Sequence, residues 1–139
     1  MTDNLLPILM QRQLYLCYIF LYNKIKVLNS KLVQNTFIEN NVILSSNVIL
    51  GGNIHIMNGA QLGIRTIVHQ NQIIGSYSML GMNSVITKKS IIDPGYIFYG
   101  RPVKRVKKNL IGLKRNKITA DNLIKEKKRF KLLFKMKKK

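Results

Sequence analysis

The chain has 139 residues, the size of a single domain, and its 24 Lys and Arg against 5 Asp and Glu give a formal charge of +19. One cysteine, Cys17, excludes an internal disulfide, and no Cys/His cluster predicts a zinc site. Most of the positive charge lies from Lys104 onward. Such a tail binds nucleic acid, anionic lipid or an acidic protein, or is simply solvated. Because no groove-reading motif or aromatic platform accompanies it, nucleic-acid binding is not expected.

Residues 1–30 are the least regular part of the chain. Two apolar runs, residues 5–10 and 14–22, are separated by three polar residues, and each is too short to span a bilayer. No charged leader or small-residue cleavage site indicates a signal peptide. We expect an irregular cap here, with a degenerate repeat or a short membrane-surface segment as the alternatives. We expect a cytoplasmic protein.

From residue 31 to about 100 the sequence has a period of six. An aliphatic or aromatic residue recurs in one register, at Leu32, Ile38, Leu44, Leu50, Ile56, Leu62, Val68, Ile74, Leu80, Ile86, Ile92 and Phe98. A second, smaller or β-branched residue comes two positions earlier, at Val42, Val48, Ile54, Ala60, Thr66, Ser78, Ser84 and Ser90. This period is neither that of a helix nor the alternation of one strand. It predicts a parallel β-helix of hexapeptide repeats, stable only when its coils stack.

The residue after each recurring aliphatic is often small or turn-forming, as at Gly51, Gly63 and Gly75. We expect the backbone to round the corners of the β-helix there, at positive φ in places. Pro94-Gly95 and Gly100-Arg101-Pro102 then end the repeat.

Residues 101–139 are predicted to form a basic connector and a C-terminal helix, in which Thr119 and Asp121 supply the N-terminal cap. One face of that helix carries Leu123, Lys127, Phe130, Phe134 and the stem of Lys137. We expect this face to pack against the solenoid or a neighbouring subunit, and the alternative is binding to a membrane surface. The chain thus divides into residues 1–30, the β-helix at 31–100, and the basic connector and helix at 101–139.

Five short strings resemble the cytoplasmic acyl-[acyl-carrier-protein]–UDP-N-acetylglucosamine O-acyltransferases, which start lipid A synthesis. They are Asn41–Leu44, Leu50–Gly52, Val68–Gln70, Ile74–Gly75 and Asn109–Arg115. The resemblance covers residues 29–118, and the Gly-Leu-Lys-Arg turn at 112–115 is its most specific part. It implies an all-β, left-handed parallel β-helix with a short basic C-terminal helix, assembled as a homotrimer with active sites between solenoids. Family members have further N-terminal coils and a longer C-terminal domain, so we expect this chain to be truncated at both ends.

The resemblance also implies a catalytic mechanism. In that family a histidine acts as general base on the sugar 3-hydroxyl, which attacks the acyl thioester. An ungapped alignment puts Gln34 at the position of this base, and an amide cannot accept the proton. Gly52 matches the backbone N–H donor to the oxyanion, although a corner glycine is the simpler explanation. Asn53 lies where the family has another histidine.

The remaining site residues follow from the same alignment. His69 and Gln70 match the sugar-nucleotide site, or else form a solvent-facing turn. Asn109 and Arg115 match the positions that face uridine and diphosphate, or else are solvated. Met82 matches the position that limits acyl-chain length and would shorten the groove, or else fills a gap between subunits.

The implied activity is transfer of a 3-hydroxyacyl group from acyl carrier protein to the 3-hydroxyl of UDP-N-acetylglucosamine, impaired or lost because of Gln34. No cofactor and no metal are expected, and acyl carrier protein, as an acidic donor, suits a basic surface. A non-catalytic remnant or structural solenoid, whose basic tail binds an anionic surface, is the alternative. A third possibility is an acyltransferase acting on a different nucleotide sugar.

Overall fold

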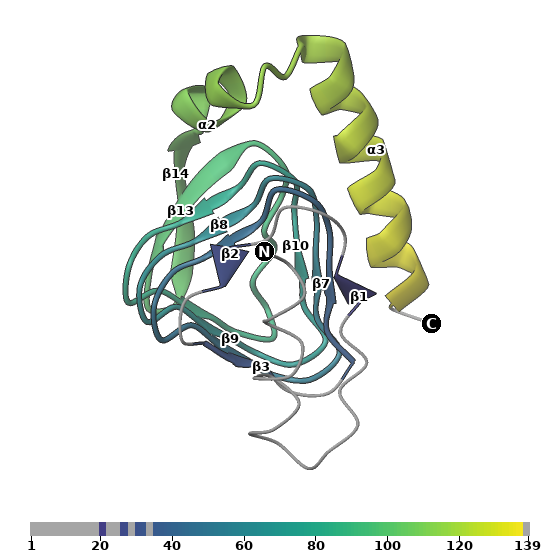
Figure 1. The fold of residues 1–139 in the computed structure, drawn as a ribbon. Coiled ribbons are helices and arrows are strands. Elements are labelled where there is room, and N and C mark those ends of the chain that lie inside the picture. Colours follow the sequence, from purple (N-terminus) through teal and green to yellow (C-terminus); the bar gives the residue numbers. More distant parts are fainter. Residues whose placement is uncertain (1–19, 22–25, 28–29, 33–34, 138–139) are drawn as a thin grey trace.

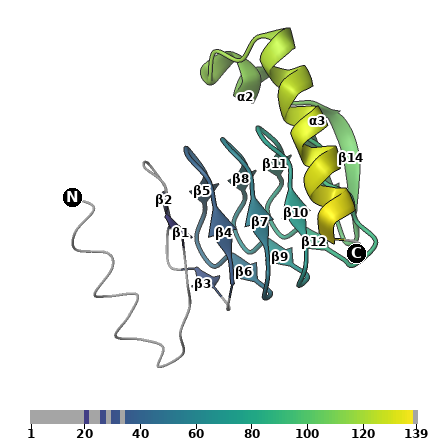
Figure 2. The same cartoon turned by 90° about the vertical axis from the view of Figure 1, so that its right-hand side faces the viewer.

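The computed structural model describes residues 20–21, 26–27, 30–32 and 35–137 (Figure 1). The described chain is a left-handed parallel β-helix with a helix lying across one side, which confirms the predicted fold class. Figure 2 shows the coils stacked along one axis, with the C-terminal helix beside the last coils.

Three sheets form the sides of the triangular prism, and we name them A, B and C. Sheet A contains β1 (Phe20–Leu21), β4 (Phe37–Ile38), β7 (His55–Ile56) and β10 (Ile73–Ile74). Sheet B contains β2 (Lys26–Val27), β5 (Ile43–Leu44), β8 (Gln61–Leu62), β11 (Met79–Leu80), β13 (Tyr96–Gly100) and β14 (Val103–Lys108). Sheet C contains β3 (Lys31–Leu32), β6 (Ile49–Leu50), β9 (Ile67–Val68) and β12 (Val85–Ile86).

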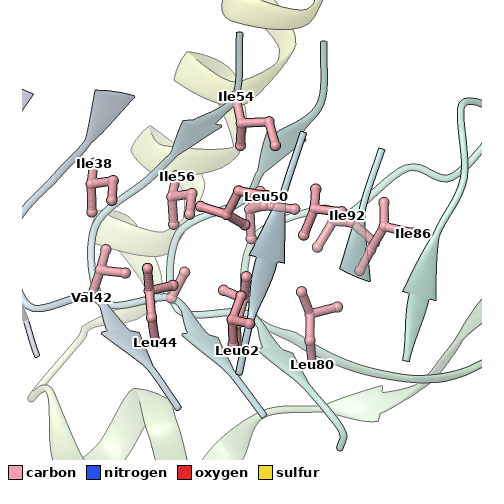
Figure 3. Packing of buried hydrophobic residues seen from close by; sticks show 14 of the residues in the cluster. Ile38, Val42, Leu44, Leu50, Ile54, Ile56, Leu62, Leu80, Ile86 and Ile92 are labelled. Carbon is pink, nitrogen blue, oxygen red and sulfur yellow. The ribbon is translucent and has the colours of Figure 1, made fainter. Parts of the chain in front are cut away.

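The recurring apolar residues fill the prism (Figure 3). Every member of the predicted column from Ile38 to Phe98 is at most 2% exposed, while the side chain of Leu32 lies outside the described residues. The second column is buried from Val42 to Ser84 as well. Full burial of one such aliphatic side chain stabilises a fold by about 1.5–3 kcal/mol. Because these side chains are covered by the coils above and below, the stack is the source of their burial.

The corners turn at a different residue from the one predicted. Positive φ falls three residues after every recurring aliphatic from Leu32 to Ile92 except Ile86, at Asn35, Asn41, Asn47, Asn53, Gly59, Arg65, Asn71, Tyr77, Asn83 and Gly95. Asparagine tolerates this left-handed conformation better than most residues. Gly51, Gly63 and Gly75 instead allow close stacking, because a Cβ at Gly51 would lie 2.6 Å from the backbone nitrogen of Gln70 in the next coil. The prediction of positive φ at these three glycines is therefore wrong.

The first described strands extend the stack with a shorter repeat. Leu21 pairs with Ile38 and Val27 with Leu44, so these partners are 17 residues apart in sequence, whereas Leu32 pairs with Leu50, 18 residues on. One residue fewer therefore separates Val27 from Leu32. Counting back six residues from Leu32 therefore reaches Lys26, whereas the residue that pairs with Leu44 is Val27.

The segment predicted as a basic connector contains a strand and a short helix. β14 pairs antiparallel with β13, and a cis peptide bond joins Arg101 to Pro102 in the hairpin between them. Helices α2 (Leu110–Arg115) and α3 (Ala120–Lys137) follow. The Thr119 hydroxyl accepts a hydrogen bond from the N–H of Asn122 (3.3 Å), so Thr119 caps α3 as predicted.

Helix α3 packs on the outer face of sheet A. Phe130 is 6% exposed and lies with Leu133 and Phe134 against Met57 and Ile73. This confirms packing as the role of the apolar helix face that the sequence indicates. Among the described residues, no helix is long and apolar enough to cross a membrane.

Candidate functional site

Four of the predicted site residues lie together at the corner between sheets C and A, which we call the C–A corner (residues 51–53, 69–71 and 87–89). Gly52 and Asn53 connect β6 to β7, and His69 and Gln70 connect β9 to β10 in the next coil. The N–H of Asn71 donates to the Gly52 carbonyl (2.9 Å), and the Asn53 amide donates to the Asn71 side-chain oxygen (2.7 Å). These bonds hold the two levels of the corner in register.

His69 is exposed at this corner and its ring is oriented by the backbone. The backbone N–H of His69 donates to the Ile86 carbonyl, and ring Nδ1 lies 2.9 Å from the carbonyl oxygen of Gln70. Because a carbonyl only accepts, Nδ1 carries the proton in this contact and Nε2 of the neutral ring keeps its lone pair. An imidazole held in this tautomer can accept a proton from a hydroxyl group.

Gln34, the predicted position of the family base, lies outside the described residues. Its role therefore remains a prediction from the alignment.

The other predicted site residues lie at different corners of the same chain. Met82 is 59% exposed at the corner between sheets B and C. Asn109 and Arg115 lie at the two ends of α2, beside the corner between sheets A and B. One chain therefore brings together only the residues of the C–A corner.

Asn109 has a structural role that the sequence reasoning missed. It is 4% exposed; its amide donates to the Tyr77 carbonyl (2.9 Å), and its side-chain oxygen accepts from the N–H of Gly112 (3.1 Å). It therefore caps α2 and anchors it to the solenoid. An Asn three residues before a helical N–H is a recognisable N-cap signal, and it could have been found. Arg115 is exposed in the last turn, where a cation is favourable.

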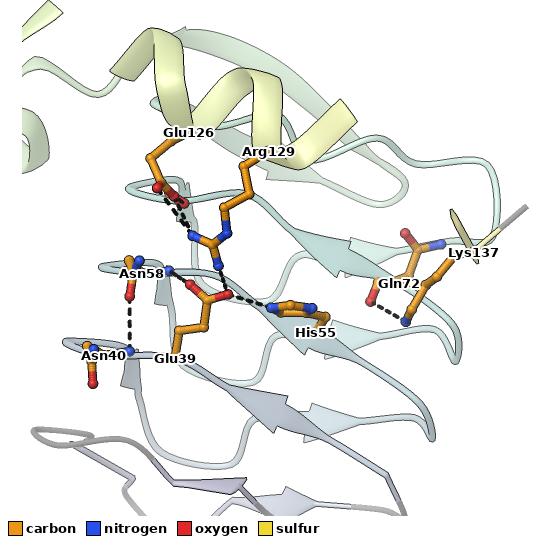
Figure 4. Close-up of polar contacts among 9 residues, drawn as sticks. Glu39, Asn40, His55, Asn58, Gln72, Glu126, Arg129 and Lys137 are labelled. Carbon is orange, nitrogen blue, oxygen red and sulfur yellow. Dashed lines mark hydrogen bonds and ion pairs between the residues drawn. The ribbon is translucent and has the colours of Figure 1, made fainter. Parts of the chain in front are cut away.

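A second polar cluster lies beneath α3 and also escaped the sequence reasoning (Figure 4). The carboxylate of Glu39, a residue that is 5% exposed, contacts His55 Nε2 (2.6 Å), the guanidinium of Arg129 and the N–H of Asn58 (3.0 Å). Arg129 also pairs with Glu126 (3.0 Å), which in turn accepts from the Ser76 hydroxyl. No local signal marks this cluster, because Glu39 and Arg129 are 90 residues apart.

His55 in this cluster is a neutral hydrogen-bond donor. Burial, and then the nearby charge of Lys137, lower the pKa of His55 from 6.5 to about 4. The adjacent Glu39 carboxylate alone would raise that pKa, but Arg129 already compensates its charge. The ring therefore donates from Nε2 to Glu39 at neutral pH. This arrangement fastens the helix to sheet A, and it does not expose a base to a substrate.

The described residues include no group of three His, Cys, Asp or Glu side chains that could hold a metal ion. At the C–A corner the available groups are backbone amides, side-chain amides, one imidazole, the Thr87 hydroxyl and the ammonium groups of Lys88 and Lys89. Such groups bind and orient polar substrates and transfer protons.

The solved structures that are similar to this one include the following two. A UDP-N-acetylglucosamine acyltransferase of Arabidopsis is 23% identical, with a TM-score of 0.58, over 66% of this chain and 31% of its own. LpxA from Acinetobacter baumannii is 26% identical, with a TM-score of 0.59, over 76% of this chain and 40% of its own.

The chain thus spans well under half the length of either protein. No protein-family model matches the chain, and no curated protein does. The solenoid, its period and these structural likenesses together support a hexapeptide-repeat acyltransferase relationship and give the chain the fold of that group.

Proposed function

We propose that this protein is an acyltransferase that acts on UDP-N-acetylglucosamine, with an acyl carrier protein as donor and with its catalytic base altered at Gln34. The observation that carries the proposal is the C–A corner, where Gly52, Asn53, His69 and Gln70 lie on two adjacent coils. The 26% sequence identity with LpxA over 76% of the chain supports UDP-N-acetylglucosamine as the proposed substrate. No cofactor is required for transfer from a thioester to a hydroxyl group.

The corner can supply two elements of such a reaction. Gly52 is half-buried at this corner, and its backbone N–H could stabilise the oxyanion without a side chain. With Nδ1 donating to the Gln70 carbonyl, Nε2 of His69 can accept a hydrogen bond from a sugar hydroxyl. With an amide at position 34, proton removal from the sugar hydroxyl lacks its base. We therefore expect substrate binding to be better preserved than turnover.

A trimer would complete the site. The C–A corner and the exposed Arg115 lie at different corners of one chain, so they meet only across a contact between chains, whereas the buried Asn109 anchors the helix that carries Arg115. Exposed apolar residues are available for such a contact on sheet C and at its edge with sheet B. They are Ile49 (42% exposed), Ile67 (38%), Ile64 (47%) and Met82 (59%). We propose that these residues form the interface of a homotrimer, and that the assembly works in the cytoplasm.

The test is an acyl-transfer assay with UDP-N-acetylglucosamine and 3-hydroxyacyl carrier proteins of several chain lengths. We expect wild-type transfer close to background, and a gain of about a hundredfold in Gln34→His, the size of a general-base contribution. Gln61→His on sheet B, half-buried and away from the C–A corner, is the matched control and should stay at the wild-type rate.

Three outcomes discriminate among the alternatives. Wild-type turnover equal to that of Gln34→His would show that the base has not been lost. Transfer only to another nucleotide sugar would change the substrate. No transfer by either protein, together with no binding of UDP-N-acetylglucosamine in calorimetry, would sink the enzyme proposal and leave a structural solenoid with a basic tail.

The acyl-chain position is tested in the same assay. Met82 is exposed, so Met82→Gly should not disturb the core, and we expect it to shift the preferred acyl group to a longer chain. An unchanged preference would remove Met82 from the proposed site.

A further inference from the structure

A cavity of about 650 Å³ lies at the C-terminal end of the stack, between the β13–β14 hairpin and α3. Figure 2 shows these elements together at that end of the solenoid. The apolar side chains that line it are Ile91, Pro94, Phe98, Val103, Phe130 and Phe134. Phe98 is 2% exposed and Phe130 is 6% exposed, so the cavity reaches the core of the last coil. Its volume is typical of a small-molecule site.

Cations surround the opening of this cavity. Lys127, Lys131 and Lys135 recur every four residues along α3 and so follow one side of the helix. Arg105 of β14 lies on the opposite wall. Among the lining residues Asp93 is the only carboxylate, and it is paired with Arg105 (2.8 Å). The three lysines therefore have no carboxylate partner in the lining.

The polar chemistry of the cavity suits one anionic group better than a nucleotide. Arg105 lies 4.7 Å and Lys127 5.0 Å from the centre of the Tyr96 ring, so two cations already occupy the aromatic surface on which a base would stack. Ammonium groups donate hydrogen bonds and cannot accept them. A matching ligand therefore has a head that only accepts hydrogen bonds, attached to an apolar body.

We propose that this cavity binds a fatty acid, with the alkyl chain against Phe98, Phe130 and Phe134 and the carboxylate among the lysines of α3. Charge complementarity selects the anionic head, and the apolar walls select a single chain. The cavity contains no residue of the C–A corner, so the inference is independent of the proposed acyl transfer. A flat membrane surface would not reach side chains as buried as Phe98.

The experiment is calorimetric titration of the full chain with dodecanoate below its critical micelle concentration. We expect saturable binding of one dodecanoate per chain, no binding of acetate, which lacks the chain, and none of dodecyltrimethylammonium, which has the opposite charge. Val103→Trp should fill the cavity and reduce affinity at least tenfold. Lys131→Glu should also weaken binding about tenfold or more by reversing one charge at the opening.

Lys128→Glu is the matched control, because it makes the same charge change on the same helix at an exposed residue outside the cavity. Its affinity for dodecanoate should equal that of the wild type, and all variants should keep the wild-type melting temperature within a few degrees.

Four results would overturn the proposal. Equal losses in Lys131→Glu and Lys128→Glu would mean that only diffuse charge attracts the ligand. Equal affinity for the cationic detergent would remove the role of the lysines. Binding to phosphatidylglycerol vesicles without saturable dodecanoate binding would replace the cavity with a membrane surface. Dodecanoate uptake that disappears when the chain self-associates would assign the cavity to a second copy.

Discussion

Sheets A and C both bury aliphatic side chains on the inside, but their outer faces differ in exposure. Inside, Ile56 of sheet A and Leu50 of sheet C are both fully buried. Outside, Ile73 of sheet A is 4% exposed, whereas Ile67 of sheet C is 38% exposed. The difference is α3, which covers sheet A and leaves sheet C open (Figure 1). The hexapeptide repeat determines the interior of such a solenoid, and segments outside the repeat determine which of its sides are covered.

The contact between α3 and sheet A combines apolar and charged groups. Phe130 supplies the buried apolar side chain, and the Glu39–His55–Arg129 cluster supplies the polar contacts. If these contacts hold the helix, variants at the contact between α3 and sheet A should lose stability, while matched variants outside this contact should lose much less.

The largest effect is expected for Phe130→Ala. Removing a buried aromatic ring leaves a cavity between α3 and sheet A, and should lower the free energy of unfolding by about 3 kcal/mol. Urea denaturation measures this loss. Leu132→Ala on the same helix is 62% exposed and should change stability by less than about 0.5 kcal/mol. Equal losses in the two variants would mean that α3 is not docked as described.

Glu39→Gln should have the next largest effect. It keeps the shape of the side chain but leaves the half-buried Arg129 with Glu126 as its remaining carboxylate partner, and we expect a loss of about 2 kcal/mol. The matched control is Asp93→Asn, which breaks the more exposed pair with Arg105 and should cost at most about 1 kcal/mol. If the control proves the costlier substitution, the buried cluster does not fasten the helix.

The pH dependence of stability should show a smaller effect from His55. Its pKa is about 4 in the folded chain and 6.5 unfolded, so between these values the unfolded state binds the extra proton. Stability from this group is complete above pH 6.5 and decreases as the pH falls toward 4. Because the ring is partly solvated, we expect a loss of about 1 kcal/mol over this window.

The test is to measure the unfolding free energy of the wild type and of His55→Gln at several pH values. Between pH 6.5 and 4 the unfolding free energy of His55→Gln should depend less on pH than that of the wild type. His69→Gln serves as the control for removing an imidazole from the C–A corner. If His69→Gln flattens the curve and His55→Gln does not, the assignment to His55 is wrong.

The smallest effect on the folded chain, and the sharpest contrast with sheet A, is expected for Ile67→Lys on sheet C. An exposed side chain on an uncovered face should change the unfolding free energy of the monomer by about 0.5 kcal/mol or less. In the proposed trimer, however, three like charges would meet at the interface and prevent association. Sedimentation velocity distinguishes the monomer from the trimer, and a trimer that persists in Ile67→Lys would exclude sheet C from the interface.

The interior of the prism was largely predictable from the sequence, because an apolar residue at every sixth position marks the side chains that point into the coil. The positive φ at the corners could also have been predicted, since Asn35, Asn41, Asn47 and Asn53 recur in one register. The prediction instead placed it at glycines of another register. β14 was missed because its strand is mostly exposed and basic, so it lacks an alternating apolar pattern.

The sites divide in the same way. Residues of the C–A corner could be grouped from the sequence, because a fixed coil length brings positions 18 apart side by side. The Glu39–Arg129 contact could not, since it depends on where α3 docks after a hairpin and a short helix. For the same reason the cavity beside Phe130 had no counterpart in the sequence. Its walls come from three elements with no shared periodicity.

The course of α3 along the prism also affects how the protein unfolds. Arg129 reaches Glu39, Phe130 contacts Met57 and Ile73, and Lys127 lies over Tyr96, so one helix touches four successive levels of the stack. A bare solenoid interacts only between nearest neighbours and can fray from either end. Here none of these four levels can separate before the helix is released. The helix therefore couples the coils into one cooperative unit, and loss of the helix should allow them to open one at a time.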